Sequence, residues 1–129
     1  MAVRIVRLGT PRARDEGLRI GTVRRPPRGV RKERYAKDDW FDVWLPEVAP
    51  SADLVQWIRS STSAAAWKTF ERRYTAEMKR PDASRILDLL AALSHSANFA
   101  VGCYCEDESR CHRSILRKLL ANRNALIDS

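Results

Sequence analysis

Three cysteines and a histidine lie within ten residues near the end of the 129-residue chain, at Cys103, Cys105, Cys111 and His112. Thiols and imidazoles act in proteins as nucleophiles, as proton acceptors and as ligands for soft metal ions. The number of cysteines is odd, and the first residues carry arginines inside a short apolar stretch, unlike a secretory leader. We therefore expect reduced thiols in a cytoplasmic protein.

Cys111 opens the run Cys111-His112-Arg113, which stands where a helix is predicted to begin. A thiol at a helix N-terminus meets unpaired backbone N–H groups and the positive end of the helix dipole, which lower its pKa and favour the thiolate. His112 and Arg113 would act in the same direction, whereas the acidic residues 106–108 would act against them. We therefore take Cys111, His112 and Cys105 as candidate catalytic residues of a cysteine-dependent enzyme whose reaction is left open.

The same four side chains, Cys103, Cys105, Cys111 and His112, are of the types that bind zinc. The usual ligand spacing of about two to four residues is absent, however, and a neighbouring Cys-His pair must twist strongly for both side chains to reach one ion. We therefore predict no metal ligands and name no cofactor, and a zinc-binding structural protein stays an alternative. In another alternative the thiols are small core residues, which we prefer for Cys103 but not for residues 111–113.

Positive charge is concentrated in the first third of the chain. Residues 1–37 hold 12 Lys and Arg against 3 Asp and Glu, whereas residues 38–129 hold 12 against 13. Residues 24–28 read Arg-Arg-Pro-Pro-Arg, and the paired prolines exclude helix and sheet there. Guanidinium groups and helix N-termini both bind phosphate. The binding residues that we predict for an anionic ligand, such as a nucleotide or nucleic acid, are Arg24, Arg25, Arg28 and Arg113.

Strands and helices are predicted to alternate along the chain. Runs of apolar and β-branched residues indicate the strands, and apolar residues at helical spacing indicate the helices. The predicted strands are residues 3–8, 18–23, 39–45 and 98–105, and the predicted helices are residues 52–59, 64–79, 82–95 and a last one from 111 onward. Ser51 is expected to cap the first helix, Pro81 to end the second, and Asp82 or Ser84 to cap the third.

This alternation predicts one α/β domain over residues 1–129, with a mainly parallel sheet flanked by helices in a three-layer, Rossmann-like arrangement. Residues 98–105 are mostly apolar and directly follow a helix, so we expect them to form a central strand. Four tryptophans are expected to be core or packing residues rather than platforms for base stacking: Trp40, Trp44, Trp57 and Trp67. No apolar run approaches the ~20 residues that cross a bilayer, so no membrane partner is expected. The oligomeric state is left open.

Two polar segments are predicted to adjoin strand ends. Residues 103–113 follow one predicted strand, and the basic loop 24–28 follows another. In open α/β sheets ligands bind beyond the carboxyl ends of the strands. We therefore expect the loop arginines and the start of the last helix to form one pocket for a phosphate-bearing ligand.

Residues 102–114, Gly-Cys-Tyr-Cys-Glu-Asp-Glu-Ser-Arg-Cys-His-Arg-Ser, closely resemble the signature of the family known as domain of unknown function 488. The basic loop 22–30, the Ala-Pro-Ser segment at 49–51, and the helix carrying Phe70, Tyr74 and Glu77 resemble further segments of that family, in the same order along the chain. The resemblance implies a compact α/β domain with a Cys-His-Arg site and implies no reaction.

The basic loop departs from the pattern of looser relatives. Many of the looser relatives in the family that this chain resembles carry an Asp-Arg-Leu-Trp-Pro-Arg-Gly run. Residues 23–29 of this chain read Val-Arg-Arg-Pro-Pro-Arg-Gly instead. The acid and the tryptophan are missing from this chain. Any role of those two residues elsewhere in the family is therefore not carried over.

Overall fold

The computed structural model describes residues 1–128, in which strands and helices alternate. The elements are β1 (Val3–Arg7), β2 (Leu18–Gly21), β3 (Val43–Trp44), α1 (Ala52–Arg59), α2 (Ala64–Glu77), α3 (Pro81–Leu93), β4 (Phe99–Cys103), α4 (His112–Ala121) and β5 (Ile127–Asp128), with single 3-10 turns at Lys32–Arg34, Pro46–Val48 and Glu108–Arg110. This confirms the predicted α/β fold class. None of the described helices is long and apolar enough to span a lipid bilayer.

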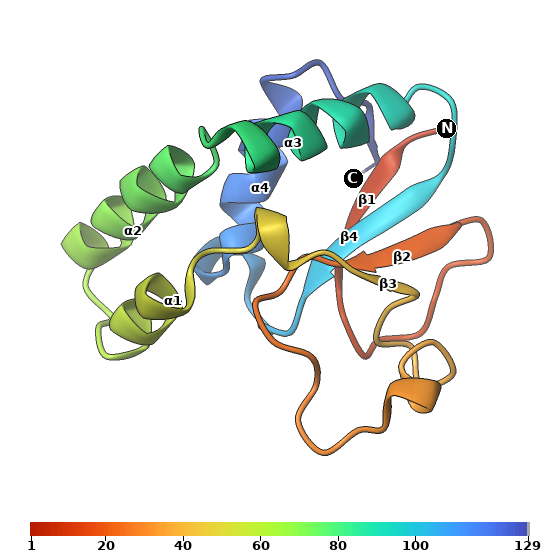
Figure 1. Cartoon of the computed structure of the whole chain (residues 1–129), viewed down its shortest axis with the longest axis horizontal. Helices are drawn as coiled ribbons and strands as arrows, with labels where there is room; N and C mark the ends of the chain where they lie inside the picture. Colours follow the sequence, from red (N-terminus) through yellow and green to blue (C-terminus); the bar gives the residue numbers. More distant parts are fainter. Residues whose placement is uncertain (129) are drawn as a thin grey trace.

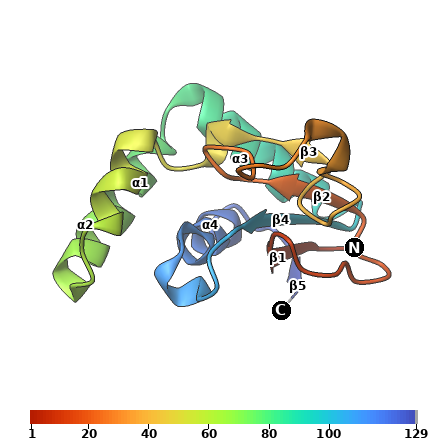
Figure 2. The ribbon, with the colours of Figure 1, turned by 90° about the horizontal axis from the view of Figure 1, so that it is seen from below.

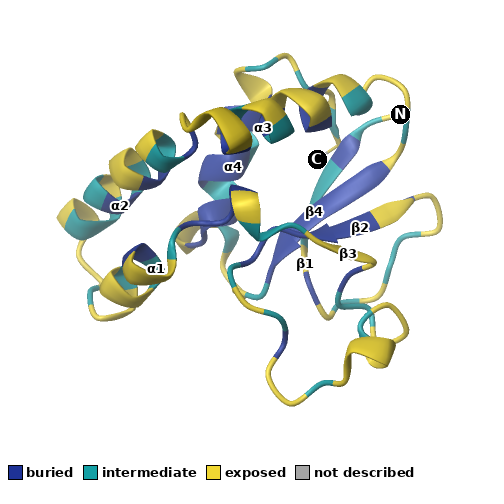
Figure 3. Ribbon diagram, viewed as in Figure 1, coloured by how far each residue is buried: buried dark blue, intermediate teal, exposed yellow. Residues whose placement is uncertain are grey.

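All the strand pairs of the sheet are parallel, and the strand order is β3-β2-β4-β1-β5 (Figure 1). β4 lies in the centre, as its apolar sequence predicted, and it is buried along its whole length (Figure 3). Val3 of β1 and Leu18 of β2 both pair with Phe99 of β4, so the three strands begin level with one another. Their carboxyl ends therefore reach the same edge of the sheet.

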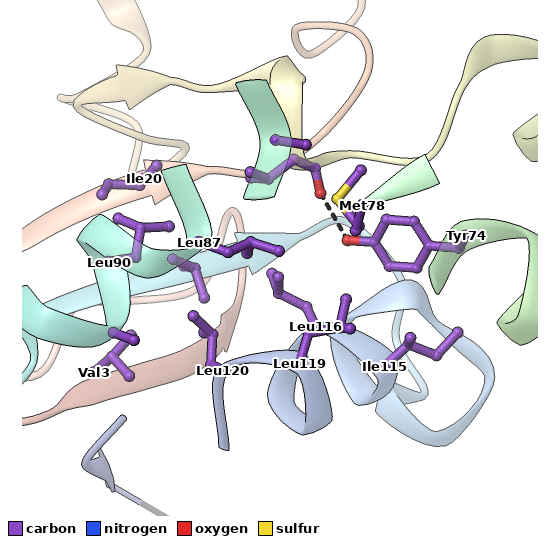
Figure 4. Packing of buried hydrophobic residues seen from close by; sticks show 14 of the residues in the cluster. Val3, Ile20, Tyr74, Met78, Leu87, Leu90, Ile115, Leu116, Leu119 and Leu120 are labelled. Atoms are coloured by element: carbon purple, nitrogen blue, oxygen red, sulfur yellow. Dashed lines mark hydrogen bonds between the residues drawn. The ribbon is translucent and has the colours of Figure 1, made fainter. Parts of the chain in front are cut away.

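One face of the sheet packs against α3 and α4 and forms the main hydrophobic core (Figure 4). Val3 and Ile20 of the strands meet Leu87 of α3 and Leu116 of α4 in a single buried cluster. Removal of this apolar surface from water is the main force that holds the two helices on the sheet.

The opposite face of the sheet is covered by loops. Gly21 of β2 lies directly against the ring of Phe41, and a Cβ atom at position 21 would be 2.4 Å from that ring. Phe41 belongs to a second buried cluster that also holds Leu8, Cys103 and Cys111. The third layer of the molecule therefore consists of loops with a single turn of 3-10 helix, seen below the strands in Figure 1 and in front of the sheet in Figure 2.

The helices α1 and α2 extend beyond the carboxyl ends of the strands (Figure 1). Ser51 caps α1 as predicted, because its Oγ accepts a hydrogen bond from the Leu54 N–H at 3.3 Å. The buried Tyr74 hydroxyl of α2 donates to the Val48 carbonyl at 2.6 Å. This bond ties α2 to the segment that leads into α1, so the two helices form one wall facing the end of the sheet.

The junction between α2 and α3 differs from the prediction. α2 ends at Glu77, and Pro81 begins α3 instead of ending α2. Proline suits the first helical position because its φ is already set and an N–H there would have no partner within the helix. The predicted caps Asp82 and Ser84 lie inside α3, whose N-cap is Arg80 with no side-chain cap bond.

The tryptophans do not share one core. Trp44 and Trp57 are 42% and 36% exposed and lie outside the buried core, although the guanidinium of Arg73 lies over the Trp57 ring. Trp44 lies on the edge strand β3, where the sheet has no further strand to cover it. Trp40 and Trp67 are half-buried and line a pocket.

Candidate functional site

A pocket of about 1250 Å³ lies at the carboxyl ends of β1, β2 and β4. Residues 7–10, 23–28 and 103–105, which end or follow these three strands, form one side of it. Residues of α1, α2 and their connection form the other side. This is the edge at which parallel α/β sheets bind ligands.

The two groups of residues singled out in the sequence meet in this pocket. Its lining includes the basic loop residues Arg24, Arg25 and Arg28 together with Cys105, Cys111 and His112. Arg113 behaves differently, because it is buried and does not line the pocket. Its Nη2 donates to the Cys105 carbonyl at 2.6 Å, and its buried Nε has no hydrogen-bond partner among the described residues. Arg113 therefore holds the loop that carries Cys105 from outside the pocket lining.

Positive charge dominates the lining of the pocket. The lining contains six arginines, with no Asp or Glu among its described residues: Arg7, Arg24, Arg25, Arg28, Arg59 and Arg110. Arg24 is held in place, since its Nε and Nη2 donate to the Pro50 and Ala49 carbonyls at 3.0 Å each. Within residues 1–128 the guanidinium groups of Arg25, Arg28 and Arg59 make no hydrogen bond or ion pair. Their charges are therefore available to an anion.

Aromatic rings line the same pocket. Trp40 packs edge-to-face on Tyr104 with ring centroids 5.8 Å apart, and Trp67 stacks on Phe70 at 4.9 Å. The guanidinium of Arg110 lies 5.7 Å from the centre of the Trp67 ring and also donates to a backbone carbonyl. Such flat apolar surfaces beside guanidinium groups suit a ligand with both a ring and negative charge.

A cluster of thiols forms the deep part of the pocket. Cys111, 1% exposed, is the residue before α4, and Cys103 ends β4. The ligand atoms of Cys103, Cys111 and His112 all lie within 4.8 Å of one another. Cys105 is exposed, and its Sγ lies 3.9 Å from that of Cys103. We call these four residues the thiol cluster.

His112 is oriented by a backbone carbonyl. Its Nε2 lies 2.7 Å from the Thr22 oxygen, and a carbonyl only accepts, so Nε2 carries the hydrogen. The ring also packs edge-to-face on Tyr74 with centroids 5.6 Å apart. In the neutral imidazole the lone pair is then on Nδ1, which is the atom able to accept a proton or bind a metal ion.

The pKa values of the three thiols move apart because the groups interact. Hydrogen bonds from Cys103 and Cys105 lower the pKa of Cys111, and His112 lowers it further, although burial raises it. The Cys105 hydrogen bond lowers the pKa of Cys103, but the hydrogen bond to Cys111 and burial outweigh it and raise that pKa to about 11. Hydrogen bonds with Cys103 and Cys111 raise the pKa of Cys105. Among the three thiols, Cys111 is therefore the one whose thiolate is favoured.

The acidic residues before α4 do not reach the pocket. Glu108 accepts two hydrogen bonds from Arg117, at 2.8 and 3.1 Å, and Glu106 forms an exposed ion pair with Arg7 at 3.6 Å. Asp107 caps the following 3-10 turn by accepting from the Ser109 N–H. The acidic run therefore leaves the positive charge of the lining largely intact.

The fold and the site together define a parallel α/β protein with a basic, thiol-containing pocket at the carboxyl edge of its sheet. A family model described as "Active DUF488-N3 subclade" matches residues 3–124. The chain therefore belongs to the DUF488 family, as the motifs at residues 22–30 and 102–114 indicated. No curated protein and no solved structure matches it.

Proposed function

We propose that the pocket binds a phosphate-bearing ligand with a planar ring, a nucleotide or a nucleotide unit of a nucleic acid. The observation that carries this proposal is the lining, in which six arginines and several aromatic rings occur with no described carboxylate. Guanidinium groups pair with phosphate oxygens through two parallel hydrogen bonds, and aromatic faces stack on bases. The volume of about 1250 Å³ exceeds the roughly 300–1,000 Å³ of common ligand pockets and leaves room for such a ligand.

The arginines divide into two kinds in support of this proposal. Arg24 donates hydrogen bonds to the Ala49 and Pro50 carbonyls and so shapes the pocket. Arg25 and Arg28 stand on the proline-containing loop with their guanidinium groups unpaired within the described chain. The loop is itself held, because the Tyr104 hydroxyl donates to the Arg25 carbonyl at 2.8 Å. The unpaired arginines are therefore presented by a positioned backbone.

The test compares variants of the loop with a matched variant outside it. Binding of a fluorescent adenine nucleotide and of a fluorescent oligonucleotide to the metal-free chain would be followed by anisotropy at several salt concentrations. Arg25→Gln and Arg28→Gln should each lower the affinity about tenfold, since a hydrogen bond to a charged group contributes about 1.5–3 kcal/mol. Arg85→Gln, which removes the same charge from the exposed surface of α3, should have little effect.

The salt dependence separates the two ligand classes. A nucleic acid contacts several phosphates, so its affinity should fall steeply with salt, whereas a single nucleotide should show a shallow slope. If neither probe binds at low salt, the proposal is overturned. Equal weakening by Arg85→Gln and Arg25→Gln would also overturn it, because the attraction would then come from overall charge rather than from the pocket.

A further inference from the structure

We propose that the thiol cluster binds one zinc ion through Cys103, Cys105, Cys111 and His112. The sequence predicted no metal ligands because the residue spacing is unlike that of a zinc knuckle. The fold brings the four residues together by a different route, and this inference does not depend on the proposed ligand of the pocket.

The distances match a tetrahedral thiolate site. With Zn–S bonds of about 2.3 Å, two sulfurs of a tetrahedron lie roughly 3.8 Å apart. The Sγ atoms of Cys103 and Cys105 are 3.9 Å apart, and the ligand atoms of Cys103, Cys111 and His112 are within 4.8 Å of one another. Cys103, Cys111 and His112 are therefore already close enough to hold one ion, and Cys105, near Cys103 but outside that group of three, would join them by moving its side chain.

The backbone at Cys111 allows the neighbouring side chains of Cys111 and His112 to reach one ion. Cys111 has extended dihedral angles, with φ −122° and ψ 150°, and the helix begins at the next residue. The change from extended to helical conformation between the two residues brings both side chains within 4.8 Å of the Cys103 sulfur. Cys103 and Cys105 are two residues apart at the end of β4, where alternate residues share a side.

The surroundings of the cluster are those of a metal site. Metal-bound histidines usually donate their second ring N–H to a carbonyl or carboxylate, and His112 donates to Thr22 at 2.7 Å. Arg113 Nη2 donates to the backbone carbonyl of Cys105 at 2.6 Å and so holds the loop that carries this cysteine. Cys105 is exposed to the pocket, which supplies a path by which an ion enters.

Charge balance also favours the complex. In the complex the three cysteines bind as thiolates, so binding releases the protons of those thiols that are not already ionised, while the imidazole binds through its neutral Nδ1. Three thiolates and one Zn²⁺ leave a net charge of −1. The arginine-rich lining next to the cluster offsets that charge.

The experiment uses the full chain after reduction and treatment with a chelator. Co²⁺, which reports its ligands by absorption, is titrated at neutral pH and is then displaced by Zn²⁺. We expect one ion per chain, thiolate-to-cobalt charge-transfer bands in the near ultraviolet and the visible absorption of tetrahedral cobalt. Cys103→Ser and Cys111→Ser should each lower the cobalt affinity and weaken these bands, because each removes one of three thiolates, and His112→Gln should lower the affinity by more than the ~10–100-fold typical of outer-shell substitutions.

The second histidine of the chain supplies the control. His95→Gln changes an exposed histidine that contacts the Asn124 carbonyl, and it should leave cobalt binding unchanged. Absence of the charge-transfer bands in the wild-type chain would overturn the proposal, as would bands of undiminished intensity and unchanged cobalt affinity in Cys111→Ser. If the serine variants do not fold, alkylation of the wild-type chain decides. Protection of all three thiols by Zn²⁺, reversed by chelator, supports the site, and unchanged alkylation rates refute it.

Discussion

Two polar clusters, the Glu16–Arg19 pair and the thiol cluster, differ in how completely the protein satisfies their hydrogen bonds. Arg19 is fully buried, and its Nε and Nη2 donate to the Glu16 carboxylate at 2.7 and 2.9 Å. Its Nη1 donates to the Thr10 and Asp39 carbonyls at 2.8 Å each. In the thiol cluster, by contrast, the side chains make one hydrogen bond to a residue outside the cluster within residues 1–128, that of His112 Nε2 with the Thr22 carbonyl.

The difference contrasts a cluster whose partners all lie within the chain with one for which we propose a bound ion. A buried charge is tolerated only when its partners are complete, and the Glu16–Arg19 pair has them all within the chain. The hydrogen bonds of Arg19 hold in place the loops that carry Thr10 and Trp40, two residues of the pocket lining. In the thiol cluster the three thiols interact with one another, and thiolates and an imidazole are the zinc ligands of the site proposed above. The Glu16–Arg19 pair therefore holds the lining of the pocket in place, and the thiol cluster is the part for which we propose ion binding.

The largest expected effect comes from breaking the closed cluster. Glu16→Gln should lower the free energy of unfolding by about 3–5 kcal/mol, because it leaves the buried Arg19 charge without its counter-ion. Urea unfolding at neutral pH would measure the loss. Asp38→Asn is the matched control, since it breaks an exposed ion pair with Arg34 and should cost only about 0.3–0.5 kcal/mol. Equal losses in the two variants would contradict the distinction drawn here between the clusters.

An effect of intermediate size should depend on zinc. At a free Zn²⁺ concentration about 100 times the dissociation constant, binding should raise the free energy of unfolding of the wild-type chain by about 2.7 kcal/mol. Cys111→Ser should gain none of this, whereas Asp38→Asn should gain all of it. Urea midpoints with and without Zn²⁺ would show the contrast. An equal gain in Cys111→Ser would mean that the ion binds elsewhere.

The elements of the fold that were predicted correctly are the ones encoded locally. The apolar run of β4 and the helical spacing of α2 are properties of neighbouring residues, and both were found. β5, with two residues, was not predicted, because it exists only through its pairing with β1. Pro81 was read as the end of one helix, although it begins the next, because the sequence does not say on which side of a proline a helix continues.

The sequence predicted which residue types form the site, but it did not predict the part of the lining that comes from distant helices. The basic loop and the cysteines were recognised from composition, and their meeting followed from the rule for parallel sheets. Arg59 and Trp67 were not recognised as pocket residues, because they arrive from α1 and α2 and no local pattern marks that contact. No metal ligands were predicted, because of the residue spacing and the twist that a neighbouring Cys-His pair requires, and zinc was kept as an alternative. The extended backbone at Cys111, on which the present proposal rests, is visible only in the fold.

The smallest expected effect lies at the edge of the closed cluster and depends on pH. Burial raises the pKa of Asp42, but hydrogen bonds from Arg12 and from the Arg19 N–H outweigh it and lower the pKa below its ordinary value. A lowered pKa in the folded chain means that Asp42 contributes stability above the unfolded value of about 3.9, and that this contribution disappears as the pH falls through the folded value.

Asp42→Asn should therefore cost about 1 kcal/mol at neutral pH, where the charged hydrogen bond with Arg12 is lost and the one from the Arg19 N–H is kept. The stabilities of the variant and the wild-type chain should converge as the pH falls below about 3.9. Urea unfolding across this range would reveal the convergence, with Glu16→Gln beside it, because burial raises the pKa of Glu16 but Arg19 and the Ala13 N–H lower it by more. A constant gap between Asp42→Asn and the wild type at all pH values would show that shape, rather than the Asp42 charge, holds this edge of the cluster.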